Sequence, residues 1–225
     1  MKSKKMKTDT IKKALLLLGI VALFWNCKSA QLVSNWKNPD TVLFHAYKVL
    51  IVGMTENDSI RGDFESKVRA EFQKRNVEAV RSVDVFDIDF TASKQSEKQL
   101  TEVEQQLLDK DFDAILFTKI IGSENKKTLR TRIADADRYL YTFQDDYLTH
   151  QGIFHEDDYY DNYTVFHAET ALYCICVGKE RETIWRAGID ITQPQDFKKT
   201  INEYIKLVIA SMEEQDLIFY DSDKS

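Results

Sequence analysis

Potential metal ligands gather in one stretch of the chain, which runs from residue 150 to residue 167. The histidines and aspartates there are His150, His155, Asp157, Asp158, Asp161 and His167. Imidazoles and carboxylates can bind Zn²⁺, which lowers the pKa of a bound water in a metal-assisted hydrolase. The spacing matches neither the HExxH pattern of zinc enzymes nor the DxDxDG pattern of calcium loops. A solvated acidic loop without a metal is therefore favoured, with a metal-assisted hydrolase as the alternative.

Aromatic side chains are mixed with the acidic ones in the same region. Residues 135–161 hold eight acidic side chains and one arginine, with five tyrosines and two phenylalanines among them. Tyrosines among polar residues suit contacts with another protein. We expect a long loop or insertion at about residues 126–162, and a binding surface there is a further possibility.

Cys174 and Cys176 are two residues apart in a segment typical of a strand, so both side chains should point to one face. Their neighbours Tyr173 and Ile175 face the other way and are also apolar. An extended pair at this spacing has poor geometry for a bond between its own sulfurs. We expect two buried, reduced thiols, with redox chemistry as the alternative.

No nucleotide-binding or nucleophile motif occurs in the sequence. The turn from Gly53 to Gly62 has neither GxGxxG nor GxxxxGK[ST], and GxSxG is absent. Glu56 and Asp58 would repel a phosphate at the start of the following helix, where Asp58 or Ser59 should serve as the N-cap. We expect no cofactor and no catalytic residue, which favours a binding protein over an enzyme.

Strand and helix patterns alternate through the first half of the domain. Apolar runs predict strands at 48–52, 77–85 and 113–121, and apolar residues at helical spacing predict helices at 59–74 and 97–110. Ser96 and Gln99 form a capping-box pattern at the start of the second helix. The order βαβαβ predicts parallel strands with helices packed against the sheet.

The second half of the domain has a different pattern of predicted elements. Strand patterns at 164–177 and 182–192 are separated by a short turn, which predicts an antiparallel hairpin. The final helix has the clearest amphipathic pattern, carried by Phe197, Ile201, Tyr204, Ile205, Val208, Ile209 and Met212. We expect a single α/β domain over residues 47–220, in which a βαβαβ parallel core is extended by the hairpin and by a C-terminal helix on the sheet. A frayed tail should follow at 221–225.

The N-terminus has the order of a signal peptide. Six lysines precede an apolar run from Ala14 to Trp25, which is shorter than the ~20 residues needed to span a bilayer. The run stops at Asn26, so residues 1–26 are the expected signal peptide and Cys27 the first residue of the mature chain. An uncleaved anchor and an ordinary secretory signal are the alternatives.

The segment Leu23-Phe24-Trp25-Asn26-Cys27 resembles the processing site of bacterial lipoproteins. The resemblance implies that the Cys27 thiol takes a diacylglycerol, that the preceding residues are removed, and that the new amine is acylated, with palmitate a typical chain. Several acyl chains would make attachment to a membrane effectively permanent. We expect residues 27–46, with Trp36 and Pro39, to form a tether between lipid and domain.

Charge and cysteine content narrow the possible partners. Cleavage before Cys27 would remove six lysines and one aspartate from 31 basic and 37 acidic side chains, which leaves a formal charge of −11. A surface this acidic repels nucleic acid and anionic lipid head groups. The anchor should therefore be lipid rather than a basic patch, and no disulfide framework is expected.

The order of elements, with the segment Ile184-Trp185-Arg186-Ala187-Gly188 before a final helix, resembles uncharacterised envelope lipoproteins with a small α/β domain. This resemblance implies a place in the cell envelope, on the outer membrane facing the periplasm. It implies no reaction. We expect a non-catalytic binding or scaffolding module whose partner is another envelope protein.

Overall fold

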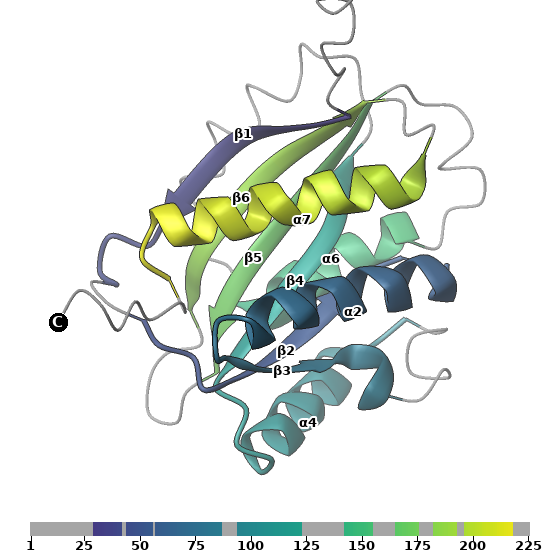
Figure 1. The fold of residues 1–225 in the computed structure, drawn as a ribbon. Helices are drawn as coiled ribbons and strands as arrows, with labels where there is room; N and C mark the ends of the chain where they lie inside the picture. Colours follow the sequence, from purple (N-terminus) through teal and green to yellow (C-terminus); the bar gives the residue numbers. More distant parts are fainter. Residues whose placement is uncertain are drawn as a thin grey trace, which may run out of the picture.

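The computed structural model describes residues 29–41, 44–55, 57–86, 94–122, 142–154, 165–175, 182–192 and 196–217. Within these ranges six strands form one mixed sheet in the order β1-β6-β5-β4-β2-β3, with helices on both faces (Figure 1). The mixed α/β fold class predicted from the sequence is confirmed, including the C-terminal helix on the sheet. The expected signal peptide, Cys27 and the expected tail at 221–225 lie outside the described residues.

The parallel half of the sheet follows the predicted βαβαβ order. Its elements are β2 (Lys48–Gly53), α2 (Asp58–Gln73), β3 (Glu78–Arg81), α4 (Glu97–Leu108) and β4 (Ala114–Gly122). Strand β2 pairs in parallel with both β3 and β4. The capping box of Ser96 and Gln99 is present at the start of α4. The expected cap of α2 is wrong, because Asn57 occupies that position and its side chain accepts the amide hydrogen of Ile60 at 3.0 Å.

Strand β3 is shorter than the predicted 77–85, because a 3-10 turn, η1 (Ser82–Asp84), begins directly after Arg81. The fully buried carboxylate of Glu65 on α2 holds this turn. It accepts hydrogen bonds from the Ser82 hydroxyl at 2.5 Å, the Val83 amide at 3.2 Å and the Gly53 amide at 3.0 Å. A Cβ at position 53 would lie 3.0 Å from the Phe64 ring, so a larger residue there would require this ring to shift.

The antiparallel half contains the predicted hairpin of β5 (Val165–Cys174) and β6 (Thr183–Thr192). A third strand, β1 (Ala30–Lys37), pairs antiparallel with β6 at the edge of the sheet. Residues 30–37 were expected in the tether of residues 27–46, so that expectation is wrong for them. Strand β1 therefore begins three residues after Cys27 in the sequence.

The insertion expected at about 126–162 contains a helix. Residues 143–154 form a helix, α6 (Phe143–Phe154), which packs against β4. Its inner face includes Phe143 and the buried carboxylate of Asp146. The acidic pattern that suggested a solvated loop thus includes one carboxylate with partners inside the domain.

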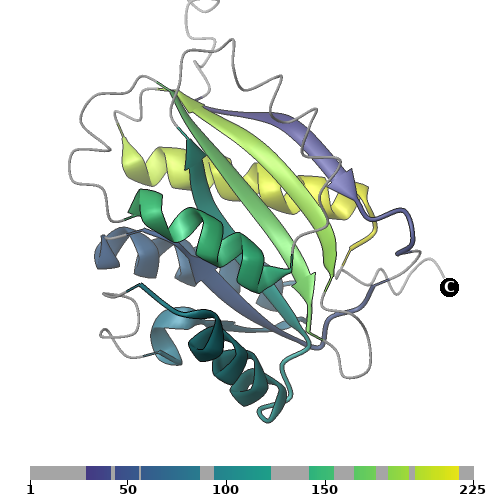
Figure 2. The same ribbon diagram turned by 180° about the vertical axis from the view of Figure 1, so that it is seen from behind.

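Helices of the described ranges cover both faces of the sheet, as the views from the front and from behind show (Figure 1, Figure 2). On one face, α2 and α7 (Phe197–Glu214) pack on a core that includes Leu116, Leu172 and Trp185. On the other face, α4 and α6 pack on a second core that includes Ile115 and Phe117. The sheet is therefore buried from both sides where these helices lie.

Helix α7 docks on the sheet as predicted. Of its seven apolar positions, Tyr204, Ile205, Val208, Ile209 and Met212 are buried and Ile201 is partly buried. Phe197, at the first position of the helix, is 53% exposed, so the expectation that it packs in the core is wrong. No helix in the described part of the chain is long and apolar enough to cross a membrane.

Candidate functional site

A cavity of about 560 Å³ lies above the sheet between the first halves of α2 and α7. Figure 1 shows these two helices side by side over the same face, with both starting at the same end of the sheet. Ile60 and Phe64 line the cavity from α2, and Ile201 and Tyr204 line it from α7. Its volume falls within the roughly 300–1,000 Å³ of small-molecule sites. We name it the α2/α7 pocket.

The polar groups in the floor of the α2/α7 pocket already have partners. The hydroxyls of Thr118 and Thr170 lie 2.8 Å apart, and the Thr170 hydroxyl lies 2.7 Å from that of Tyr204. Burial raises the pKa of Tyr204 far above its usual value, so this hydroxyl stays neutral. The rest of the floor is largely apolar and includes Ile120, Phe166, Ala168 and Ile191. The pocket therefore suits an apolar ligand.

The helix ends beside the pocket are capped by side chains. The carboxylate of Asp196 accepts the Lys199 amide hydrogen of α7 at 3.1 Å, as Asn57 does for Ile60 in α2. Asp58 adds a negative charge in the first turn of α2. Occupied amides and nearby carboxylates disfavour an anion at this end.

Ser29, two residues after Cys27, is fixed beside the pocket. Its amide and its hydroxyl donate hydrogen bonds to the Glu203 carboxylate of α7 at 2.8 and 2.7 Å. These hydrogen bonds lower the pKa of Glu203. The Ser29 hydroxyl also lies 3.0 Å from that of Thr200, which lines the α2/α7 pocket. The chain that follows Cys27 is thus attached at the edge of the pocket.

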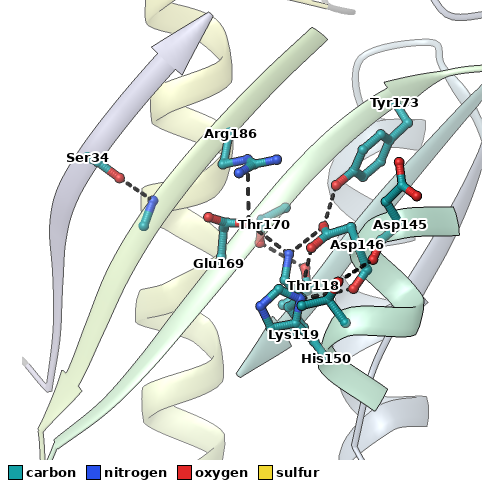
Figure 3. A network of polar contacts seen from close by, with 12 residues as sticks. Ser34, Thr118, Lys119, Asp145, Asp146, His150, Glu169, Thr170, Tyr173 and Arg186 are labelled. Carbon is teal, nitrogen blue, oxygen red and sulfur yellow. Dashed lines mark hydrogen bonds and ion pairs between the residues drawn. The ribbon is translucent and has the colours of Figure 1, made fainter. Parts of the chain in front are cut away.

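A cluster of buried charges lies on the opposite face of the sheet, beneath α6 (Figure 3). The ammonium group of Lys119 on β4 is fully buried and lies 2.5 Å from Asp146 on α6 and 2.7 Å from Glu169 on β5. Arg186 on β6 lies 3.5 Å from the same Glu169 carboxylate. Asp146 also accepts a hydrogen bond from the Tyr173 hydroxyl. We call Lys119, Asp146, Glu169, Tyr173 and Arg186 the Lys119 cluster.

The Lys119 cluster fixes the position of α6 on the sheet. Each charge in it faces an opposite charge, which is the condition for burying ions without a large net cost. Burial alone would raise the pKa of Asp146, but the charge of Lys119 and hydrogen bonds from neighbouring donors outweigh it and hold this pKa well below its usual range. The carboxylate therefore stays ionised. Within the described residues we assign the cluster a structural role.

Replacing Asp146 with Asn should destabilise the domain at neutral pH, and the loss should shrink as the pH falls below about 4. A carboxyl with a depressed folded pKa stabilises the fold above its unfolded pKa and loses this effect as acid protonates it. Urea unfolding of wild type and variant at several pH values measures the difference. An identical difference at pH values of about 7 and 3 would exclude an ionised Asp146 as the source.

The structure describes two of the candidate metal ligands, His150 and His167. His150 on α6 lies 3.0 Å from an Asp146 carboxylate oxygen, and His167 on β5 lies 2.8 Å from Asp190 on β6. The other ring nitrogen of His167, Nε2, is buried and has no hydrogen-bond partner among the described residues. Among the described residues no three potential ligands converge on one point. His155, Asp157, Asp158 and Asp161 lie outside the described residues, so the metal-assisted hydrolase that uses them stays a prediction.

Cys174 is buried, as expected, but it is disulfide-bonded rather than reduced, so that expectation is wrong. The chain's other cysteines, Cys27 and Cys176, lie outside the described residues. The expectation of reduced thiols rested on one extended strand that contains both residue 174 and residue 176. Strand β5 instead ends at Cys174, so the assumption fails at that residue.

Comparison with known proteins yields only structural matches. No family model matches the sequence, and neither does any curated protein. One similar solved structure is the PelC dodecamer from Paraburkholderia phytofirmans, which is 7% identical with a TM-score of 0.41, over 81% of this chain and 96% of that one. Another is lipoprotein GNA1162 from Neisseria meningitidis, which is 10% identical with a TM-score of 0.38, over 74% and 96%. TM-scores of this size indicate only a loose resemblance between the folds.

Proposed function

We propose that the chain is a lipid-anchored protein of the bacterial cell envelope whose domain binds an apolar ligand in the α2/α7 pocket without catalysis. The observation that carries the binding site is the pocket itself, with its apolar walls and its already paired hydroxyls. The anchor is supported by the lysine-rich start, the short apolar run and Cys27. The outer membrane, with the domain facing the periplasm, is the proposed location.

A small apolar ligand is favoured over a large protein partner at this site. The large apolar side chains that are exposed within the described ranges are Val33, Tyr47 and Phe197. They come from β1, from the segment before β2 and from the start of α7. These separate side chains do not form the continuous apolar patch that marks a protein interface. Most of the apolar lining of the pocket instead lies between two helices and the sheet, with Phe197 exposed at its edge. A contact with another envelope protein is therefore the second possibility.

Filling the pocket tests the proposed site. Ile201→Trp places a larger side chain in the cavity and should weaken binding of a fluorescent fatty acid by roughly tenfold or more, equivalent to at least about 1.4 kcal/mol. Lys206→Trp adds the same side chain at an exposed position of the same helix and should leave binding unchanged. Fluorescence titration of both variants against wild type measures the effect. Equal affinities in all three proteins would rule out the α2/α7 pocket as the binding site.

A further inference from the structure

Ser29, the first described residue after the expected anchor at Cys27, lies at the edge of the α2/α7 pocket. Ser29 contacts Thr200 and Glu203 in the first half of α7, and Thr200 lines the pocket. Two residues of extended chain span at most about 7 Å, so Cys27 cannot lie far from this point. Strand β1 starts at Ala30, which leaves little chain to separate the domain from a lipid on Cys27. The edge of the pocket must then lie close to the leaflet that holds the lipid.

The exposed side chains at this end suit a membrane surface. Phe197, the 53% exposed aromatic residue at the start of α7, is part of the pocket lining, and Lys198 and Lys199 follow it on the exposed side. Aromatic rings and the stems of lysines are favoured where a protein meets the head groups of a bilayer. Elsewhere the mature chain is strongly acidic, which disfavours contact with anionic lipid. Phe197 therefore marks the pocket mouth as the side that meets the membrane.

The chemistry of the pocket selects the acyl part of a lipid rather than its head group. Capped helix ends and the carboxylates of Asp58 and Asp196 lie at the starts of the two helices beside the pocket, and most of the side chains that line the pocket are apolar. An acyl chain that passes from a bilayer into such a pocket exchanges one apolar environment for another. A chain that crossed water would expose every methylene group on the way. A mouth at the leaflet removes that barrier.

We infer that the α2/α7 pocket opens toward the leaflet that holds Cys27 and takes one acyl chain of a membrane phospholipid from it. The inference rests on the proposed function, because it needs both the lipid anchor and the apolar site. It adds the class of ligand, which is a phospholipid, and its source, which is the leaflet that holds Cys27. A phospholipid with a zwitterionic head group fits best, since the carboxylates of Asp58 and Asp196 and the exposed Lys198 and Lys199 all lie at this end of the helices.

Photocrosslinking from the bilayer tests the inference. The full chain, purified from membranes, is reconstituted in vesicles of phosphatidylethanolamine and phosphatidylglycerol, with a small share of phosphatidylethanolamine that carries a photoreactive diazirine in one acyl chain. After irradiation, mass spectrometry of peptides should find the lipid on the first halves of α2 and α7. Ile201→Trp should reduce this labelling roughly tenfold, and Lys206→Trp should retain it.

Other outcomes would overturn the inference in distinguishable ways. Vesicle-bound protein that lacks label on α2 and α7, but still binds fluorescent fatty acid, would retain the apolar site and reject the leaflet as its source. Fatty-acid binding that appears only in Cys27→Ser would mean that the chain's own lipid fills the pocket. The anchor is tested separately by labelled fatty acid fed to cells. Equal incorporation by wild type and Cys27→Ser would reject the proposed function itself.

Discussion

Replacement of Lys119 with Met is expected to lower the free energy of unfolding by about 3–5 kcal/mol, the usual cost of removing one partner from a buried ion cluster. Its ammonium group is fully buried and lies between the carboxylates of Asp146 and Glu169. Methionine keeps the length of the side chain but leaves two buried carboxylates without this cation. Urea unfolding of residues 28–225, which retain every described element, measures the loss.

Lys48 provides the matched control for Lys119. It also lies in an interior strand, but its side chain is 24% exposed. Its ammonium group lies 3.3 Å from the 62% exposed Glu78 and donates to the Lys110 carbonyl at 3.1 Å. Because water screens such a pair, Lys48→Met should change stability by no more than about 1 kcal/mol. If both variants lost the same amount, burial of Lys119 would not be the cause.

Truncation of Ile205 to Ala should cost about 2–5 kcal/mol, through lost burial of apolar atoms and the cavity left behind. Ile205 is 4% exposed and belongs to the core between α7 and the sheet. That cost is a large fraction of the stability of an ordinary domain. Denaturant unfolding of the same soluble chain gives the value.

Lys206, the next residue, provides the control for Ile205 on the exposed face of α7. It is exposed, so Lys206→Ala should change stability by no more than about 0.5 kcal/mol. If Ile205→Ala unfolds no earlier than Lys206→Ala, the docking of α7 on the sheet does not stabilise the domain.

The sequence was sufficient for elements whose apolar pattern is strong and local. The buried run at Lys48–Gly53, the capping box at Ser96 and the stripe along α7 each correspond to an element in the structure. These signals depend on neighbouring residues alone, which is why they could be read without knowledge of distant partners.

Strand β1 and helix α6 escaped prediction because their partners are distant in the sequence. Strand β1 pairs with β6, and a register shift between Leu32 and Ser34 breaks the alternation that would have marked a strand. Helix α6 buries Asp146 rather than an unbroken apolar stripe. From the sequence alone a carboxylate is expected on the surface, and the structure shows that Lys119 faces this one. The one available hint was Lys119 itself, a charge within an otherwise apolar run.

The α2/α7 pocket could not be predicted from any motif. Its lining comes from both helices and from strands on either side of the sheet centre, and residues as far apart as Gly53 and Tyr204 share it. The sequence directed attention to the histidines and aspartates near residue 155 instead. A cavity arises from how elements pack, which composition and spacing do not specify.

Native mass spectrometry of the full chain, extracted from membranes in mild detergent, tests the central claim most directly. The wild-type protein should carry the covalent mass of a lipid on Cys27 and, in addition, one non-covalently bound lipid. Ile201→Trp should keep the covalent lipid and lose the bound one, while Lys206→Trp keeps both. A wild-type protein with no bound lipid, or an Ile201→Trp variant that retains as much as wild type, would contradict a lipid-binding α2/α7 pocket.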